Sequence, residues 1–182
     1  MRRQVLYISY DGLTDPLGQS QIIPYLRLLA KRGFSIVILS FEKRQNWELS
    51  HSQIEQQLKL VDILWRPLVY TKYPPVLSTT FDIIRMIIVA KQIVARYNIS
   101  IVHCRSYIAA FAGLMLKRSR NTSFIFDMRG FWADERVEGN IWSKTNLIYK
   151  IVYTYFKRKE IEFLQQADHV ITLTQRSVSI IE

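Results

Sequence analysis

Three polar segments of this sequence carry side chains that could bind or transform a ligand, and each follows a run of mainly apolar residues. The first is the loop 11–19, DGLTDPLGQ, which contains two glycines and two aspartates. The second is the pair His103 and Arg105, which follows an Ile-Val dipeptide. The third is the segment 127–136, DMRGFWADER, in which carboxylates, guanidinium groups and an indole lie close together. Whether the three segments meet depends on the elements that carry them.

The loop 11–19 is a candidate anion site because it leads into a helix. At a helix N-terminus the unpaired backbone amides and the helix dipole favour an anion, and Gly18 has no side chain to keep a phosphate away. Gly12 and Gly18 lie six positions apart, so the dinucleotide fingerprint G-x-G-x-x-G is absent, as is the P-loop pattern. The chemistry of a tight turn is the alternative explanation of Gly18.

His103 and Arg105 lie near the carboxyl end of a predicted strand, where open parallel sheets bind their ligands. A histidine in that position could hydrogen-bond a sugar hydroxyl or transfer a proton. A structural role for an isolated histidine is the alternative.

The segment 127–136 suits a sugar ring. Asp127 and Arg129 could form bidentate hydrogen bonds with hydroxyl groups, and Trp132 could stack on the ring. The alternative is a loop that is held together by its own Asp–Arg pairs.

Composition limits the classes of function. The net charge of +10 indicates attraction to polyanions, such as phosphorylated substrates or anionic lipid headgroups. The basic residues form no recognisable nucleic-acid motif, and three histidines with one cysteine contain no zinc-ligand pattern, so we expect neither nucleic acid nor metal as a partner. Cys104, the single cysteine, is interpreted as a small buried residue. No targeting segment is recognisable, which predicts a cytoplasmic protein.

Hydrophobic periodicity predicts alternating strands and helices along the chain. The predicted strands are 5–10, 34–41, 61–68, 99–104, 123–127 and 170–173. The predicted helices are about 20–32 with Ser20 as its cap and Gly33 as its end, 46–60, 78–97, 109–117 and 143–166, with another beginning at Gln175. In the helix 78–97, Asp82 and Arg85 are assigned to a polar face, and Ile84 and Ile88 to the apolar face. This pattern predicts one doubly wound α/β domain over 1–182, Rossmann-like, with about six mostly parallel strands in a three-layer α/β/α arrangement.

Three stretches together resemble the N-terminal domain of a family 4 glycosyltransferase of the GT-B fold, and the resemblance covers essentially the whole chain. The stretches are DPLGQSQIIPYLRLLAKRGFSIVILSFEK at 15–43, IVHCRSYIAAFAGLMLK at 101–117 and FIFDMRGFWADE at 124–135. Their order and spacing, more than any one motif, carry the resemblance. It departs from the family at Leu17-Gly18, where many relatives have two glycines.

The resemblance implies a retaining transfer of a sugar from a nucleotide diphosphate sugar, without a cofactor or a metal ion. Gly18 and Gln19 would lie beside the donor phosphates, and His103 near the reacting sugar. Asp127 and Arg129 would border the acceptor, a saccharide or a lipid-linked glycoconjugate. The predicted acceptor-binding residues are Asp11, Arg105, Asp127, Arg129 and Trp132.

The donor-binding domain of the family, with its paired glutamates, is not recognisable in this sequence, so the chain alone is expected to be inactive. Basic residues near an anionic membrane gain roughly 1 kcal/mol each, which predicts peripheral attachment to the inner face of the cell membrane. A merely solvated surface is the alternative. The candidate basic residues are Arg2, Arg3, Lys72, Lys117, Arg118, Arg120 and the run 157–159. Two other functions stay open, a non-catalytic binding or membrane-docking module and a GT-B-type nucleotide-sugar epimerase.

Overall fold

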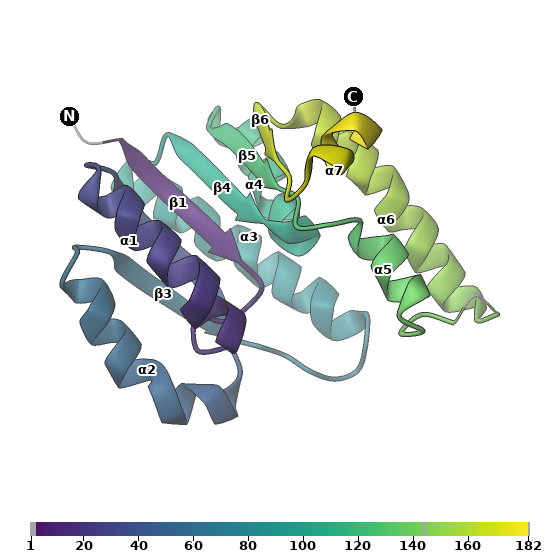
Figure 1. Cartoon of the computed structure of the whole chain (residues 1–182), viewed down its shortest axis with the longest axis horizontal. Helices are drawn as coiled ribbons and strands as arrows, with labels where there is room; N and C mark the ends of the chain where they lie inside the picture. Colours follow the sequence, from purple (N-terminus) through teal and green to yellow (C-terminus); the bar gives the residue numbers. More distant parts are fainter. Residues whose placement is uncertain (1–2, 144, 182) are drawn as a thin grey trace.

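The computed structural model describes residues 3–143 and 145–181, which form one six-stranded sheet between two layers of helices (Figure 1). The strands are β1 (Gln4–Ser9), β2 (Ser35–Glu42), β3 (Leu64–Val69), β4 (Ile101–Arg105), β5 (Ser123–Asp127) and β6 (His169–Ile171). The helices are the π-helical turn η1 (Gly18–Ile22), α1 (Ile23–Lys31), α2 (Arg44–Lys59), α3 (Leu77–Tyr97), α4 (Ser106–Arg120), α5 (Trp132–Glu138), α6 (Leu147–Gln166) and α7 (Gln175–Ile181). Every neighbouring pair of strands is parallel, in the order β3-β2-β1-β4-β5-β6. The predicted doubly wound, three-layer α/β fold is confirmed.

Each face of the sheet buries its own hydrophobic core, because side chains alternate between the two faces along a strand. On β1, Val5 and Tyr7 pack with residues of α1 and α2, whereas Leu6 and Ile8 pack with residues of α3 and α4. Figure 1 shows α1 and α2 in front of the sheet and α3 behind it. Gly33 follows the first helix with a φ of +91°, which glycine adopts without strain, so the predicted end of that helix is confirmed.

The strand order reverses between β1 and β4, and this reversal positions the candidate site. From β1 the sheet continues through β2 to β3 on one side, and from β4 through β5 to β6 on the other. Ser9, at the end of β1, is in register with Arg105, at the end of β4. Ligands of open parallel sheets bind beyond the carboxyl ends of the strands at such a reversal. The loops that follow Ser9 and Arg105 therefore border the expected ligand position.

The predicted faces of α3 are wrong. Asp82 is fully buried, whereas Ile84 and Ile88 are 53% and 51% exposed. Asp82 accepts hydrogen bonds from the Tyr10 hydroxyl at 3.1 Å and from the Thr71 amide at 3.0 Å and hydroxyl at 2.8 Å. These bonds satisfy the buried carboxyl group and fasten the helix to the loops after β1 and β3. Because α3 is apolar around most of its circumference, its sequence does not reveal which side the sheet covers.

Several predicted boundaries also differ from the structure. The segment 132–138, predicted as loop, forms the helix α5, whose first turn carries Asp134 and Glu135 and whose last turn carries Arg136. Charges of these signs stabilise the two ends of a helix dipole. Ser20 does not cap a helix, since its hydroxyl donates to the Pro16 carbonyl at 2.8 Å. Other element ends shift by one to four residues, most of all the start of α6, which is Leu147 and not residue 143.

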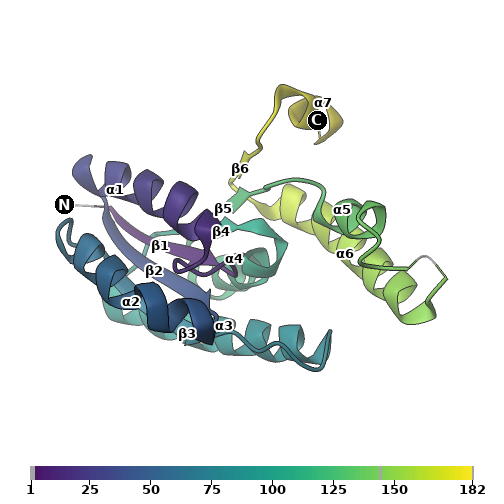
Figure 2. The same cartoon turned by 60° about the horizontal axis from the view of Figure 1, so that its bottom comes forward.

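The helix α6 crosses the edge of the domain. Its second half packs on α4 and β5 through Phe163, and the buried Glu160 accepts a hydrogen bond from the Tyr107 hydroxyl of α4. Figure 2 shows α5 and the first half of α6 extending past the sheet. The surfaces of α5 and α6 that face α3 and α4 line a cavity with them.

Candidate functional site

The carboxyl ends of β1, β4 and β5 bring four of the predicted site residues together. Asp11 lies just after β1, Arg105 and Asp127 end β4 and β5, and Arg129 follows Asp127. The side-chain oxygen of Gln21 accepts hydrogen bonds from Nη2 of Arg105 at 2.7 Å and Nη2 of Arg129 at 2.9 Å. Sequence reasoning missed Gln21, because a glutamine in a helical segment gives no signal of its partners. It connects η1 with the ends of two strands.

The polar groups of this cluster face one another at distances longer than those of good hydrogen bonds. Nε2 of His103 lies 3.5 Å from Oδ2 of Asp127, and Nη1 of Arg129 lies 3.7 Å from Oδ1 of the same carboxyl group. Nε of Arg105 lies 3.5 Å from Oδ2 of Asp11. Good hydrogen bonds between nitrogen and oxygen are shorter, at about 2.7–3.2 Å. The cluster thus attracts polar groups without saturating its own hydrogen bonds.

Unpartnered polar atoms concentrate in the same cluster. Over the residues that the structure describes, four buried side-chain atoms lack a hydrogen-bond partner, and three of them are Nε2 of His103, Nε of Arg105 and Oδ1 of Asp127. Each such atom costs about 1–3 kcal/mol of stability. Native proteins contain few of them, and a local group of three indicates a place where ligand or solvent atoms complete the bonds.

His103 lies in β4, two residues before the strand ends at Arg105. Its side chain is 4% exposed, and its ring packs against Tyr7 and Tyr25 with centroid distances of 4.7 and 5.9 Å. Burial raises the pKa of the Tyr7 hydroxyl well above its usual value, although the charge of Arg105 opposes this, so Tyr7 stays protonated. The structure thus brings His103 to the cluster but shields it from open solvent. Its predicted catalytic role stays a prediction.

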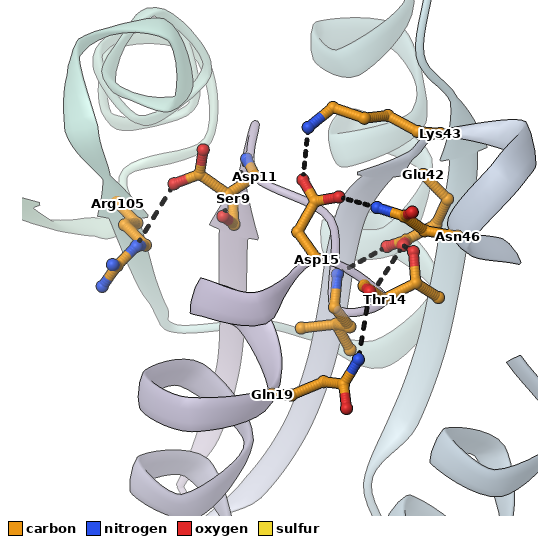
Figure 3. A network of polar contacts seen from close by, with 10 residues as sticks. Ser9, Asp11, Thr14, Asp15, Gln19, Glu42, Lys43, Asn46 and Arg105 are labelled. Carbon is orange, nitrogen blue, oxygen red and sulfur yellow. Dashed lines mark hydrogen bonds and ion pairs between the residues drawn. The ribbon is translucent and has the colours of Figure 1, made fainter. Parts of the chain in front are cut away.

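The glycine loop is held by a buried carboxyl group that the sequence patterns did not single out. Glu42, at the end of β2, accepts hydrogen bonds from the amides of Leu13 at 2.9 Å and Thr14 at 3.0 Å, and from the hydroxyls of Thr14 and Ser40 at 2.6 Å each. Figure 3 shows part of this network, with Asp15 bound by Lys43 beside it. Two amides of the loop are therefore occupied within the chain.

Gly18 and Gln19 both have contacts with the loop that precedes them. A Cβ atom at Gly18 would lie 2.6 Å from Cα of Leu13, closer than real Cβ atoms approach, so this position requires glycine for packing. The side-chain amide of Gln19 donates to the Thr14 carbonyl at 3.1 Å. These contacts explain the two residues without a ligand. Their predicted place beside donor phosphates stays a prediction.

Trp132 lies apart from the hydrogen-bonded cluster. Its ring packs on Phe156 and Trp142 with centroid distances of 4.7 and 5.2 Å, and the Arg136 guanidinium lies 4.8 Å from its centre. Trp132 and Arg105 nevertheless line the same cavity. Trp132 and Arg105 could therefore contact the same ligand in this cavity, although they form no direct bond with each other.

This cavity, which we call the α3–α6 groove, has a volume of about 670 Å³ and is lined by residues of α3, α4, α5 and α6 and by the loops after β1 and β3. Its charged lining residues are Asp11, Lys72, Arg105 and Arg136. Three basic groups against one acid make it electropositive. The rest of the lining is mostly aliphatic and aromatic, as in Ile84, Phe111 and Phe156.

Other predictions concern the basic surface and the single cysteine. Lys117, Arg118, Lys157 and Lys159 each form an ion pair with a carboxyl group of this chain, so less of the positive charge is free than the sequence suggests. Arg2 lies outside the described residues. Cys104 is fully buried, as interpreted from the sequence.

Neither a metal cluster nor a membrane-spanning helix is found in the part of the chain that the structure describes. Within 3–143 and 145–181, no group of three or more His, Cys, Asp or Glu side chains could hold a metal ion. Across the same residues, no helix is both long enough and apolar enough to cross a membrane.

Comparisons with known proteins agree with this architecture. Sucrose-phosphate synthase from Thermosynechococcus elongatus superposes with a TM-score of 0.68 at 15% identity, over 99% of this chain and 44% of that protein. A putative UDP-N-acetylglucosamine 2-epimerase from Listeria monocytogenes superposes with a TM-score of 0.57 at 12% identity, over 100% of this chain and 42% of that protein. The chain thus spans less than half the length of either, and these identities show a shared fold.

A search of curated proteins found no match. A family model, however, covers most of the chain, from α1 through α7. The match runs over residues 23–181 and is to Glycosyltransferase Family 4. The predicted family is confirmed, and the chain belongs to glycosyltransferase family 4.

Proposed function

We propose that this chain is the acceptor-side half of a retaining, metal-independent glycosyltransferase, which moves a sugar from a nucleotide diphosphate sugar to a glycoconjugate acceptor. The observation that carries the proposal is the cluster of unpartnered polar atoms of His103, Arg105 and Asp127 at the reversal of strand order. A sugar presents hydroxyl groups that both donate and accept hydrogen bonds, so it could satisfy all three.

The proposal gives each group a chemical task. Oδ1 of Asp127 accepts a hydrogen bond from a hydroxyl of the bound sugar, and Arg105 and Arg129 attract an anionic part of the substrates. Gln21 holds the two guanidinium groups in place through its side-chain oxygen. His103 lies 3.5 Å from the Asp127 carboxyl group, close enough for one hydroxyl to contact both.

The rest of the donor site belongs to a second domain in this proposal. The chain spans 44% and 42% of the two solved proteins, which leaves room in such proteins for another domain. The glycine loop contributes through Gly18 and Gln19, at the edge that faces the donor phosphates. On its own, the chain is expected to transfer no sugar.

The proposed location is the cytoplasm, with peripheral contact to the inner face of the cell membrane. The net charge of +10 supports it, since a basic protein is attracted to anionic headgroups. The internal ion pairs of Lys117, Arg118, Lys157 and Lys159 weaken this attraction. Exposed apolar residues beside the groove, such as Ile84 and Ile151, offer a second means of contact.

The test is a glycosyltransferase assay, carried out on this chain together with the second domain that the proposal requires. Nucleotide sugars would be supplied with saccharide and lipid-linked acceptors, and products would be identified by mass spectrometry and by the anomeric couplings in their NMR spectra. We expect a product with the donor's anomeric configuration and unchanged rates in EDTA. Inversion would overturn the retaining mechanism, and loss of activity in EDTA would overturn metal independence. Epimerisation of the free nucleotide sugar, with no acceptor consumed, would replace the transferase by an epimerase.

A further inference from the structure

Tyr25, on α1, lies between His103 and the surface of the protein. Its ring packs against the His103 ring in a T-shaped arrangement with a centroid distance of 5.9 Å, and Tyr25 is 40% exposed. The other aromatic neighbour of His103, Tyr7 at 4.7 Å, is only 1% exposed. Of the two tyrosine rings, only that of Tyr25 therefore reaches the solvent. Tyr25 forms part of the cover that keeps the His103 side chain buried.

The position of Tyr25 agrees with the contacts of Gln21, four residues before it. Residues four apart in a helical segment lie on the same side of it. Gln21 accepts hydrogen bonds from Arg105, at the end of β4, and from Arg129, just after β5. Tyr25 contacts His103 of β4. The helical segment thus directs both side chains toward the strand ends that carry the polar cluster.

The hydroxyl group of Tyr25 is a hydrogen-bond donor near the Asp127 carboxyl group. Burial, together with the negative charge of Asp127, raises the pKa of this hydroxyl above its usual value near 10, so it stays protonated at neutral pH. Oδ1 of Asp127 has no hydrogen-bond partner, so the tyrosine does not fill it. A donor and an unfilled acceptor close to each other suit a ligand hydroxyl, which accepts one hydrogen bond and donates another.

We propose that Tyr25 is a substrate-binding residue of the cluster, whose hydroxyl donates a hydrogen bond to the same sugar hydroxyl that Asp127 accepts from. Its ring closes His103 off from solvent and thereby keeps the unfilled Nε2 for the sugar. The role of Tyr25 toward a sugar rests on the proposed glycosyltransferase function, whereas its cover of His103 does not. The alternative is a tyrosine that only packs on its neighbours.

Chemical modification of histidine tests the cover on this chain alone. Diethylpyrocarbonate reacts with neutral imidazole groups that solvent can reach, and mass spectrometry of peptides gives the rate at each histidine. His51 is half-buried and His169 is exposed, and both serve as internal standards. Relative to them, Tyr25→Ala should raise the rate at His103 at least tenfold. Tyr25→Phe keeps the ring and should leave this rate within twofold.

The matched control for the cover is Leu28→Ala. Leu28 lies on the same helix and is 61% exposed, so its truncation should leave the rate at His103 unchanged. Circular dichroism and urea denaturation establish that the variants are folded. An unchanged rate at His103 in folded Tyr25→Ala would overturn the cover. A rise in Leu28→Ala as large as in Tyr25→Ala would do so as well.

The hydroxyl is tested with Tyr25→Phe, which does not depend on the folding of the alanine variant. The protein is the active form, this chain together with the second domain. Loss of the hydrogen bond to the sugar should lower kcat/KM about tenfold. Packing alone would leave kcat/KM unchanged, because phenylalanine keeps the ring. A value within twofold of that of the unaltered protein would therefore overturn the role of the hydroxyl, and Leu28→Ala is again the control.

A double-variant cycle tests whether Tyr25 and Asp127 hold the same hydroxyl. Two residues that bind one group of a ligand have effects that do not multiply. If Asp127→Asn alone lowers transfer about 100-fold, the double variant with Tyr25→Phe should stay near that value, because the hydroxyl has already lost its place. A fall of about 1,000-fold, the product of the two single effects, would overturn the shared hydroxyl.

The two readouts separate this inference from the proposed function. If the active form transfers sugar equally well with Tyr25→Phe, the inference fails and the glycosyltransferase stands. If His103 is modified as expected but no acceptor of any class is glycosylated, the proposed function fails together with the role of Tyr25 toward the sugar, and the cover of His103 stands.

Discussion

Glu42 and Asp127 are two buried carboxyl groups at the same edge of the sheet, and their surroundings differ. Glu42, at the end of β2, accepts four hydrogen bonds from the glycine loop and from Ser40. Asp127, at the end of β5, has its buried Oδ1 without a hydrogen-bond partner and faces His103 and Arg129 at 3.5 and 3.7 Å. Both residues are at most 5% exposed.

The difference separates a structural group from a candidate functional one. A buried carboxyl group with all its bonds made holds a loop in one conformation, and its removal leaves buried loop donors without an acceptor. A buried group that lacks partners lowers stability unless a ligand supplies them. The Glu42 side of the edge is therefore expected to control folding, and the Asp127 side to control binding and transfer.

The largest expected effect is on the Glu42 side. Glu42→Ala leaves the loop amides of Leu13 and Thr14 without an acceptor and should lower the free energy of unfolding by about 3–4 kcal/mol. Urea denaturation measures it. Glu48→Ala, at an exposed position of α2, is the control and should change stability by less than about 0.5 kcal/mol. Similar losses in both variants would show that Glu42 does not hold the loop.

Asp127→Asn should give the opposite pattern. We expect sugar transfer to fall roughly 100-fold, since the amide replaces a charged acceptor in the proposed site. Unfolding free energy should change by less than about 1 kcal/mol, because Oδ1 makes no hydrogen bond that would be lost. The two measurements are turnover in an active form of the protein and urea denaturation of this chain. A large loss of stability with normal turnover would show that Asp127, like Glu42, is a structural group and not a functional one.

His103→Ala tests whether the buried histidine belongs to the functional side. Turnover should fall at least about tenfold, while the chain keeps its fold, because Nε2 has no hydrogen-bond partner to lose. Circular dichroism and turnover are compared in the same preparations. An unchanged rate would remove His103 from the site and leave it as packing between Tyr7 and Tyr25.

The smallest expected effect comes from Asp168, which lies outside both regions and sets a baseline for surface ion pairs. Hydrogen bonds from the Lys117 ammonium and the Phe124 amide lower the pKa of the Asp168 carboxyl group. A lowered folded-state pKa adds stability above the unfolded-state value near 3.9, and this stability is lost as the pH falls through the folded-state pKa. Asp168→Asn should therefore cost about 1 kcal/mol at pH 7, and the difference should shrink below about pH 4. Urea denaturation at both pH values checks it, and a difference that stays constant with pH would show that the charge of Asp168 is not the cause.

The location of the site could be predicted from the sequence because it follows from local patterns. Apolar strands, helices between them and Gly33 as a helix end indicate a parallel sheet, and a parallel sheet places its ligand beyond the strand ends. Residues at those ends, such as Arg105 and Asp127, are thereby candidates before any contact is known. The structure brings Asp11, Arg105, Asp127 and Arg129 together, and their predicted roles in acceptor binding stay predictions.

The hydrogen-bond partners of these residues could not be predicted from the sequence, because they come from distant parts of the chain. Gln21 contacts Arg129 from 108 positions away, and Glu42 reaches the Leu13 amide across 29 positions. Neither pairing leaves a periodic signal. The prediction of the buried side of α3 failed for the same reason. A helix that is apolar on several sides is oriented by the elements packed around it and by the hydrogen bonds to Asp82.

Residues close together in the chain were enough to predict the succession of strands and helices apart from α5, the family, and the end of the sheet where a ligand is expected. The tertiary structure decided that the glycine loop is fastened to Glu42, that His103, Arg105 and Asp127 keep unfilled bonds, and that α3 and α6 enclose an apolar groove. Those features arise where distant segments pack, and packing depends on the whole fold.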